Sequence, residues 1–512
     1  MLESLFASLP VIASQLFTPE VLFALFLGVV GGMVIGALPG LSATMGIALM
    51  IPFTYGMTPI AAIAMLMAIY TSAISGGSIS AILIHTPGTP SSAATALDGY
   101  PLTLQGKGLQ ALGVAMVSSM IGGLLSAVAL LFLSPLLASA ALKFGAPEYF
   151  LLACFGLSLI ASLASDSLAK GLAAGCLGLI ICTIGIDNDS AFPRFTFGSL
   201  HMMGGIPAVP ALIGLFSIPQ VLSLIGKSIE RASSKEKMEI GEIKGRVLPS
   251  WSEFKSLIPT ILRSSVLGIG VGILPGAGGD IGSWVGYNEA KRYSKHKELF
   301  GKGSFEGVCA SETANNAVTG GAMIPMLTLG IPGESVTAVL MGGLVIQGLA
   351  PGPELFTKYA PMTYTFFAGF VLVQFFMLAI GMLGCRGFAQ ISRLSDAILI
   401  PAVTVLCFVG SYAIHRNLSD VVVMLIFGGL GYLMRKFDLN TAAVVLALIL
   451  GPISEKGLRG ALRVSGGDIG CLFTSPVSWV LIILSIAGIF SPFFMAKFEK
   501  KVTGEDEFVT ES

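Results

Sequence analysis

Two stretches of nearly the same sequence each interrupt a long hydrophobic run: GALPG at 36–40 and GILPG at 272–276. Proline removes a backbone donor and breaks the helical ladder, and glycine permits turns that other residues resist. Both stretches are therefore expected to be irregular. Lipid cannot satisfy unpaired N–H and C=O groups, so irregular backbone at membrane depth must be surrounded by protein or line a cavity. Two such breaks in corresponding halves of a membrane chain point to a transporter binding site.

The composition supports a membrane location for the whole chain. Of its 512 residues, 54% are hydrophobic and only 11% are charged, and the mean hydropathy is +0.86. A soluble domain could not cover so much apolar surface, so the chain is expected to be integral to a lipid bilayer. The 29 basic and 29 acidic residues balance, which gives no reason to expect a nucleic acid partner. Seven cysteines without a CxxC or metal spacing indicate small buried side chains rather than a disulfide framework.

The hydrophobic pattern predicts an all-α polytopic membrane protein built from two repeats. Residues 1–226 form the first repeat, with a hairpin at 20–56, a span at 58–86 broken near 75–78, and further spans. A charged, amphipathic cytoplasmic linker at 227–255 follows. Residues 256–496 form the second repeat, with a hairpin at 256–290, a span at 306–348 broken at 315–316 and 320–321, and further spans that include 438–452 and 476–496. A polar tail occupies 497–512. Each hairpin, re-entrant or helical, is expected to fold at its Leu-Pro-Gly stretch.

The repeat is visible in the order of the small residues. After each Leu-Pro-Gly comes a Gly-Gly cluster, SGGSISAIL at 75–83 and TGGAMIPML at 319–327. Each cluster is followed by Pro-Gly, at 87–88 and at 332–333. Any one match means little because glycine and proline are common in membrane helices. Three matches in the same order indicate an internal duplication.

The placement of basic residues predicts the orientation. Basic residues flank the second hairpin on both sides, whereas none precedes Lys107, so the second hairpin is expected to open to the cytoplasm and the first to the outside. An odd number of predicted crossings separates the hairpins, which gives inverted-topology repeats. Lys497, Lys500 and Lys501 place the C-terminus in the cytoplasm. A loop with Lys456, Arg459 and Arg463 would then lie outside, against the same rule.

The two hairpin tips and the two broken spans are expected to meet near the membrane midplane. Broken helices expose N–H groups, which attract anions, and C=O groups, which with side-chain oxygens coordinate small hard cations. This arrangement suits an anionic solute that moves with a cation. The predicted substrate-binding residues are Pro39, Gly40, Ser42, Thr44, Ser75, Gly76, Gly77, Ser78, Pro275, Gly276, Ala277, Gly278, Gly279, Thr319, Gly320 and Gly321. The predicted coupling-ion residues are Ser72, Asp280, Asn315 and Asn316, and no metal other than sodium is expected.

Simpler interpretations exist for the same residues. Glycine and serine also let helices pack closely in bilayers. Asp280 would only cap a helix if it lay at a wet loop tip, although it and Glu312, as ionisable groups in apolar stretches, are functional by default. Glu334 and His85, beside the Pro-Gly turns, are expected to be interfacial rather than ligating.

No enzyme motif competes with the transporter interpretation. The sequence contains no HExxH zinc helix, no GxSxG elbow and no Walker-type phosphate loop, so no catalytic residue and no cofactor is predicted. Energy is therefore expected from an ion gradient or a separate subunit. Two alternatives stay open: a membrane-embedded enzyme that acts on a lipid-like substrate through Asp280 and Glu312, and a passive channel. The enzyme alternative lacks a paired acidic motif such as DDxxD.

The same stretches resemble the large permease subunit of the tripartite tricarboxylate transporters. The resemblance is carried by GALPGLSATMGIALMIPFTYGM (36–57), SGGSISAILIHTPGTPSSAATALDGYPL (75–102), GILPGAGGDIGSWVGYNEAKR (272–292) and ETANNAVTGGAMIPMLTLGIPGESVTAVLMGGLVIQGLAPGP (312–353). It covers most of the chain and thins over the last hundred residues. His85 stands where the family pattern has an amide before Thr-Pro-Gly, and Ser311 where it has proline.

The resemblance implies a function that the pattern alone does not give. Such proteins lie in the bacterial inner membrane and work with a small membrane subunit and a periplasmic solute-binding protein that delivers carboxylates such as citrate. Transport is secondary symport with sodium ions or protons. Paired hairpins also suggest, by analogy of architecture, an elevator-type movement of a transport core across a scaffold of later spans that binds the small subunit. Which carboxylate, which ion and whether the chain forms a homodimer stay open.

Overall fold

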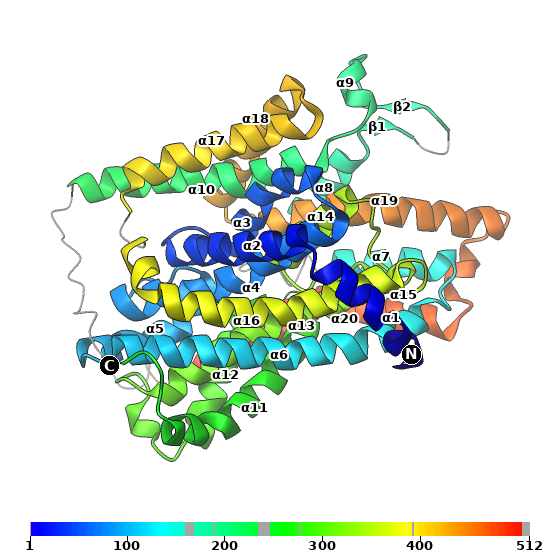
Figure 1. The fold of residues 1–512 in the computed structure, drawn as a ribbon. Helices are drawn as coiled ribbons and strands as arrows, with labels where there is room; N and C mark the ends of the chain where they lie inside the picture. The colour runs from blue at the N-terminus through cyan, green and yellow to red at the C-terminus, as the bar shows by residue number, and fades with distance from the viewer. Residues whose placement is uncertain are drawn as a thin grey trace. The chain divides into compact units, whose positions relative to one another are not determined.

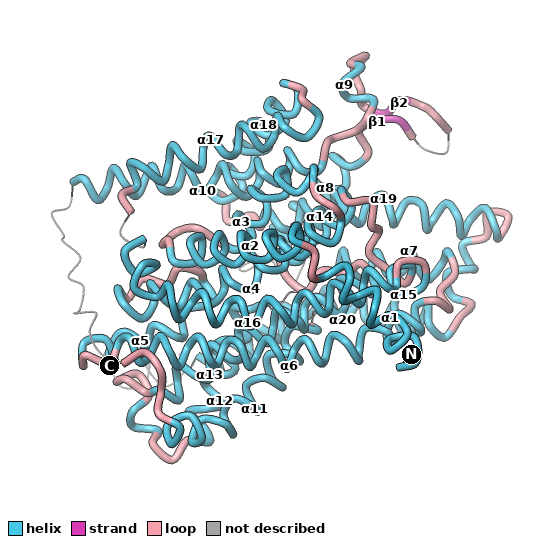
Figure 2. Tube along the Cα trace, viewed as in Figure 1, coloured by secondary structure: helices cyan, strands magenta, loops and turns pink. Residues whose placement is uncertain are grey.

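The structure is a computed structural model that describes residues 2–158, 168–187, 190–233, 246–274, 276, 278–391 and 394–503. Helices dominate these residues (Figure 2), and one antiparallel ribbon pairs β1 (Gly185–Ile186) with β2 (Pro193–Arg194). Nine helices in the described residues are long and apolar enough to cross a membrane: Pro19–Ala37, Pro59–Ile84, Gly108–Ala141, Ala208–Gly226, Trp251–Ile273, Ala360–Phe388, Ala397–His415, Leu418–Lys436 and Thr441–Val464. The predicted all-α polytopic membrane class is confirmed.

The chain divides into two compact units, and each takes one segment from each half of the sequence. The first unit comprises Met1–Leu137 and Gln220–Gly410, and the second comprises Ala138–Pro219 and Ser411–Ser512. Both Leu-Pro-Gly stretches, both Gly-Gly clusters and both Pro-Gly turns therefore belong to the first unit. The later spans are divided between the units, because 108–137 and 360–410 also belong to the first unit and the remaining later spans belong to the second.

The helices of the first unit are α1 (Leu2–Leu16), α2 (Pro19–Ala37), α3 (Ala43–Met50), η1 (Ile51–Gly56), α4 (Pro59–Ile84), η2 (Pro90–Ser92), α5 (Ala93–Leu104), most of α6 (Gly108–Ala141), α11 (Trp251–Ile273), α12 (Gly278–Tyr293), η3 (Lys297–Leu299), α13 (Phe305–Leu329), α14 (Ser335–Ile346), α15 (Glu354–Thr357), α16 (Ala360–Ile391) and most of α17 (Asp396–His415). Helix α10 (Ala208–Ser233) runs from the second unit into the first. The second unit adds α7 (Ala146–Ser158), α8 (Leu168–Cys182), α9 (Leu200–Met203), α18 (Leu418–Lys436), α19 (Thr441–Val464), η4 (Ile469–Phe473) and α20 (Pro476–Thr503).

Both Leu-Pro-Gly stretches end a helix, as the sequence predicts. Helix α2 stops at Ala37 and α11 stops at Ile273. The glycines that follow, Gly40 and Gly276, have φ angles of +90° and +88°, a backbone region that side chains other than hydrogen rarely adopt. Short helices then start at Ala43 and Gly278. Pro275 and Ala277 lie outside the described residues.

The helices before these turns pack closely against the long buried helices of the first unit. Helix α2 lies along α4 (Figure 1), and α11 lies along α13. The most apolar stretch of α4, long enough to cross a membrane, is fully buried. A Cβ atom on Gly76 would lie 2.7 Å from the carbonyl oxygen of Met33, and one on Gly321 would lie 2.7 Å from that of Ile269. Met33 and Ile269 each precede the last glycine of their helix by three residues, so both halves make the same contact.

The predicted breaks at the Gly-Gly clusters are wrong. Helix α4 continues through residues 75–78 to Ile84, and α13 continues through 315–316 and 320–321 to Leu329. The serine hydroxyls instead bond to the preceding turn, as in the bond from Ser78 Oγ to the carbonyl oxygen of Ser75 at 2.6 Å. The backbone breaks more than two turns after each Gly-Gly pair, where His85 and Gly330 adopt left-handed conformations before the Pro-Gly turns. The glycines therefore allow close packing rather than interrupting the helix.

Two further expectations concern the linker and the last spans. The linker predicted at 227–255 is partly helical, since α10 extends to Ser233 and α11 begins at Trp251, and its middle, 234–245, lies outside the described residues. The prediction of a loop around Lys456, Arg459 and Arg463 is wrong, because these residues lie within α19, which is longer than the predicted span. In the second unit α19 packs against α7 and α8, and α20 against α7.

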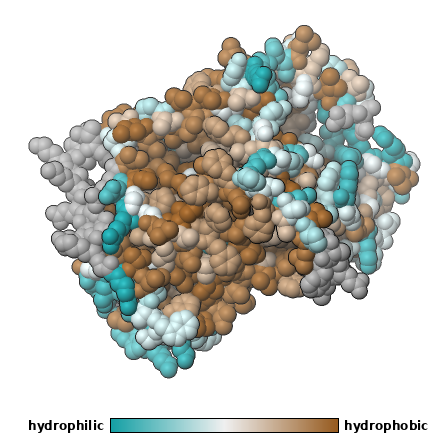
Figure 3. Space-filling model, viewed as in Figure 1, coloured by the Kyte–Doolittle hydropathy of each residue, from teal (hydrophilic) through white to brown (hydrophobic). Residues whose placement is uncertain are grey.

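The surface of these helices is suited to lipid. Hydrophobic side chains cover most of the face over α6 and α16 in Figure 3. Among them, Phe132 and Leu136 of α6 and Phe375 and Leu383 of α16 are exposed. The polar side chains of the first unit are instead concentrated inside, along α4 and α13.

The glycine contacts give a matched pair of substitutions in one helix. A Cβ atom on Gly272 would lie 2.6 Å from the carbonyl oxygen of Val318, whereas one on Gly270 meets nothing within 4 Å. We expect Gly272→Ala to lower the free energy of unfolding by about 1–3 kcal/mol, the usual cost of overpacking, and Gly270→Ala to leave it unchanged or slightly raised. Thermal unfolding of the purified variants measures both, and equal melting temperatures for the two variants would contradict the packing described.

Candidate functional site

Three helix N-termini meet in the first unit. The N-terminus of α3 touches that of α14, because Thr44 Oγ1 and Ser335 Oγ lie 3.4 Å apart. The N-terminus of α12 touches the residue before α14, because the backbone N–H of Gly279 donates to Glu334 Oε2 at 3.0 Å. Helix N-termini carry unpaired N–H groups and a partial positive charge, so this meeting point favours anions.

The turn of the second half is held by direct backbone contact. The N–H of Gly276 donates to the carbonyl oxygen of Gly333 at 2.6 Å, which joins the Leu-Pro-Gly stretch to the Pro-Gly turn. Gly278 has a φ of +60°, and a Cβ atom there would lie 2.9 Å from Glu334 Oε2. Glycine at 278 therefore leaves room for the Glu334 carboxylate beside the start of α12.

Glu334 is tied into this site by hydrogen bonds of its side chain and its backbone. Its Oε1 accepts a hydrogen bond from the hydroxyl of Tyr70, a fully buried residue of α4, and its Oε2 accepts from Gly279. Its backbone N–H bonds to Thr337 Oγ1 at 3.0 Å, which fixes the start of α14. His85, by contrast, is exposed and stacks on Tyr100 with ring centroids 4.7 Å apart.

Two more of the polar residues predicted to bind the coupling ion, Asp280 and Asn315, lie where the N-termini of α12 and α14 meet. Asp280, in the first turn of α12, has an exposed side chain and directly follows Gly279, whose N–H binds Glu334. Asn315 is fully buried in α13, and neither its Oδ1 nor its Nδ2 has a hydrogen-bond partner. Its Oδ1 lies against Gly279, 2.6 Å from where a Cβ atom would stand. Among the described residues, no ion pair involves Asp280 or Glu334.

The first hairpin tip has a simpler structure. Ser42 caps α3 by accepting a hydrogen bond from the N–H of Met45 at 3.2 Å. Gly40 lies in the turn against the side chain of Leu224 in α10, and Pro39 precedes it. Thr44 of this tip contacts the second half through its hydroxyl.

Ser75 and Asn316 lie in a separate buried network. Asn316 Oδ1 accepts from Ser75 Oγ at 3.0 Å, and its Nδ2 donates to Ser119 Oγ of α6 at 2.8 Å. Ser119 Oγ donates in turn to Glu312 Oε2 at 3.1 Å, and Thr95 Oγ1 of α5 donates to Glu312 Oε1 at 2.6 Å. This network joins α4, α5, α6 and α13. The side chain of Glu312 is fully buried within it, and among the described residues no ion pair neutralises its carboxylate.

The other predicted residues have their contacts within the helix packing. Ser72 Oγ bonds to the carbonyl oxygen of Ala68 and lies against α2. Thr319 Oγ1 donates to the carbonyl oxygen of Asn316 at 2.6 Å. Of the predicted glycines in α4 and α13, Gly76 and Gly321 face the paired helix, Gly77 faces the segment after the Pro-Gly turn, and Gly320 faces Ser126 of α6.

Sequence reasoning missed some residues of the site. Tyr70 and Ser335 carry no motif, and Glu334 could be identified only from its position at a helix N-cap after the Pro-Gly turn. The partners that make them part of a site are far away in sequence: 264 residues separate Tyr70 from Glu334, and 291 separate Thr44 from Ser335. Such pairings need the fold.

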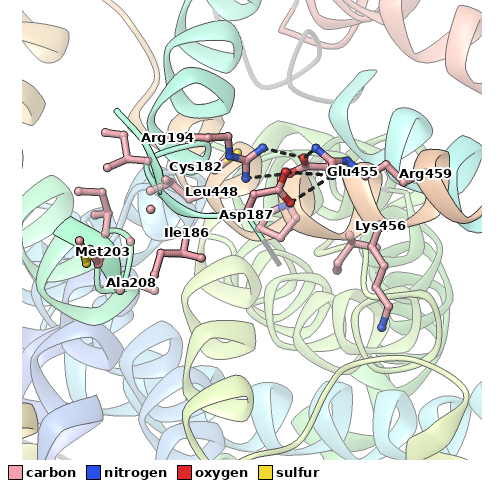
Figure 4. A pocket seen from close by; sticks show the side chains of 17 residues that line it. Cys182, Ile186, Asp187, Arg194, Met203, Ala208, Leu448, Glu455, Lys456 and Arg459 are labelled. Atoms are coloured by element: carbon pink, nitrogen blue, oxygen red, sulfur yellow. Dashed lines mark hydrogen bonds and ion pairs between the residues drawn. The ribbon is translucent and has the colours of Figure 1, made fainter. Parts of the chain in front are cut away.

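A second polar cluster lines a cavity of about 720 Å³ in the second unit (Figure 4). Glu455 Oε1 lies 2.7 Å from Arg194 Nη1 and 2.7 Å from Arg459 Nη2, and Arg459 also pairs with Asp187 at 3.0 Å. The hydrogen bond to Glu455 raises the pKa of the Arg194 guanidinium, which keeps it charged. Because each charge here already has a partner, the cluster stabilises the β1–β2 ribbon against α19.

Comparison with known proteins agrees with these features. The model of a family described as "Tripartite tricarboxylate transporter TctA family" matches residues 22–446. A protein of Agrobacterium vitis described as an uncharacterised 52.8 kDa protein in the TAR-I ttuC′ 3′ region is 35% identical over 92% of this chain and 92% of its own length. A second, from the TAR-II ttuC′ 3′ region of Agrobacterium vitis, is 32% identical over 42% of this chain and 89% of its own length. No solved structure matches significantly.

The buried network around Glu312 gives a stability prediction. Glu312→Ala removes the acceptor of two buried hydroxyls, so we expect it to lower the free energy of unfolding by about 1–3 kcal/mol, while Glu312→Gln keeps one acceptor oxygen and costs less. Glu289→Ala, on the partly exposed face of α12, is the control and is expected to change stability little. Thermal unfolding of the three variants checks the order. An alanine variant at 312 as stable as the control would contradict the network.

Proposed function

Because the chain belongs to the tripartite tricarboxylate transporter TctA family, whose members are the large membrane subunits of these systems, we propose that it moves carboxylates such as citrate, or related dicarboxylates, across the bacterial inner membrane. The observation that carries the proposal is the meeting of the N-termini of α3, α12 and α14, through the contacts of Thr44 with Ser335 and of Gly279 with Glu334. Their N–H groups and hydroxyls suit the oxygens of a carboxylate.

The mechanism follows from the chemistry of these elements. The substrate carboxylates are held by the tip residues Ser42, Thr44, Gly278 and Gly279, and a coupling ion, sodium or proton, is bound near Asp280, Asn315 and Asn316. The ion gradient drives uptake, since the sequence carries no nucleotide-binding motif. The first unit, with both pairs of turns, is the moving transport core of an elevator-type transporter. Its two hairpins enter from opposite faces of the membrane, as inverted repeats do, so that their tips meet near the midplane.

The partners follow from the family. A periplasmic solute-binding protein delivers the carboxylate, and a small membrane subunit binds the second unit, which serves as the scaffold. Selectivity among carboxylates then depends mostly on the binding protein, because N–H and hydroxyl groups bind many acids alike. Lys497, Lys500 and Lys501, near the end of α20, lie in the cytoplasm in this arrangement.

Uptake into proteoliposomes tests the proposal. The chain is reconstituted with its small subunit and binding protein, and uptake of labelled citrate and other di- and tricarboxylates is measured under an inward sodium gradient or an inward proton gradient. We expect saturable uptake that needs the binding protein and one of the two gradients. Flux that neither saturates nor needs a gradient would instead identify a channel, and no movement of any carboxylate would refute the proposed substrate class.

Three substitutions test the ion site in the same assay. Asp280→Ala, Asn315→Ala and Asn316→Ala are each expected to reduce uptake at least tenfold while the protein remains in the membrane, because each removes a polar group from the proposed ion site. Glu289→Ala, two turns beyond Asp280 on α12, is the control and keeps normal uptake. Undiminished uptake in all three variants would rule out these residues as the coupling site.

A further inference from the structure

The meeting point of α12 and α14 has an electrostatic feature that an anion site alone does not explain. The carboxylate of Glu334 accepts from the N–H of Gly279, the residue directly before Asp280, and among the described residues no ion pair supplies either carboxylate with a positive partner. Both oxygens of Glu334 accept hydrogen bonds, from Tyr70 and from Gly279. Neighbouring carboxylates disfavour each other's ionised forms, and a bound cation removes that cost.

Asn315 is an independent sign of a ligand at this point. Its side chain is fully buried in α13 and neither amide atom has a partner, although buried polar groups are nearly always hydrogen-bonded. Its Oδ1 lies against Gly279, the same residue whose N–H binds Glu334. An amide oxygen without a hydrogen-bond partner, together with two carboxylates, supplies the oxygen ligands that hard cations prefer.

We propose that Asp280, Glu334 and Asn315 Oδ1 bind one hard metal cation at the N-terminal end of α12. The proposal rests on the proposed transport function and deepens it in three ways. It adds Glu334 to the coupling site, it makes the coupling ion a metal cation rather than a proton, and it removes Ser72 and Asn316, whose polar atoms already bond elsewhere. Glycine at 278 and 279 is required, because a side chain at either position would collide with a ligand.

This site also explains how an anion is accepted beside two acidic residues. The substrate carboxylate binds the N–H groups of the helix N-termini and shares the cation with Asp280 and Glu334. Without the cation, the two carboxylates repel the substrate, so binding of ion and substrate is mutually dependent. Such dependence is the thermodynamic basis of symport.

Direct cation binding tests the proposal without transport. The purified full chain is melted in choline chloride with added sodium, potassium, magnesium or calcium chloride at constant ionic strength. We expect one of these cations to raise the melting temperature saturably, since a ligand that binds the folded state stabilises it. Sodium and a divalent cation are distinguished by which salt acts. If none of the four differs from choline, the site does not exist.

Matched variants locate the response. Asp280→Asn and Glu334→Gln keep the shape of the side chains, and their melting temperatures in choline chloride show whether they fold. We expect each to weaken the cation response at least tenfold, Asn315→Ala to weaken it and Asn315→Asp to retain it. Glu289→Gln, on the same helix but outside the site, responds as the unchanged chain does. A normal response in both Asp280→Asn and Glu334→Gln would overturn the assignment.

The experiments distinguish a failure of the cation site from a failure of the proposed transport function. A cation response that is lost in Asp280→Asn and Glu334→Gln, together with no uptake of any carboxylate, leaves the cation site in place and refutes the substrate class. Carboxylate uptake that is driven by a proton gradient, in a chain that no metal cation stabilises, supports the transport function and refutes the cation site.

Discussion

The contact of glycine backbones between paired helices is the constraint on which the first unit depends. Gly76 lies against Met33 and Gly36, and Gly321 lies against Ile269 and Gly272, with the same spacing in both halves. Inside a bilayer no hydrophobic driving force brings helices together, so close van der Waals packing of small residues must do so. Because the helices approach this closely, the turns that follow them also touch, and the bond from Gly276 to Gly333 joins the two kinds of turn directly.

The polar groups of the unit follow from this packing. Breaking α2 and α11 at Leu-Pro-Gly frees backbone N–H groups that lipid cannot satisfy, and the structure turns them toward protein. The N–H of Gly279 donates to the Glu334 carboxylate, and the hydroxyl of Thr44 contacts that of Ser335. One tip thereby brings backbone N–H groups, hydroxyls and the carboxylate of Glu334 together. The buried network of Glu312 and Asn316 lies apart from the tips and joins α4, α5, α6 and α13, a role that requires each hydrogen bond to be made.

The sequence was sufficient for the class of fold and for the turns, but not for the helices between them. Proline and glycine together break a helix for local reasons, so Gly40 and Gly276 were predictable as turn residues. Gly76 and Gly321 were wrongly predicted as breaks, because whether glycine ends a helix or admits a neighbour depends on what lies beside it. Glu334 was missed for the same reason, since its partner Tyr70 is known only from the fold. Asp280 and Asn315 were predicted together and lie against adjacent parts of one turn.

The convergence of the two halves at one site is the central claim, and disulfide cross-linking measures it most directly. In a chain whose seven native cysteines are replaced, Thr44→Cys and Ser335→Cys place two thiols where the native hydroxyl oxygens are 3.4 Å apart. Mild oxidation in native membranes should join them rapidly, whereas a control pair of Thr44→Cys with Val345→Cys, at the opposite, exposed end of α14, should not react. Equal or absent cross-linking of the two pairs would contradict a site built from both halves.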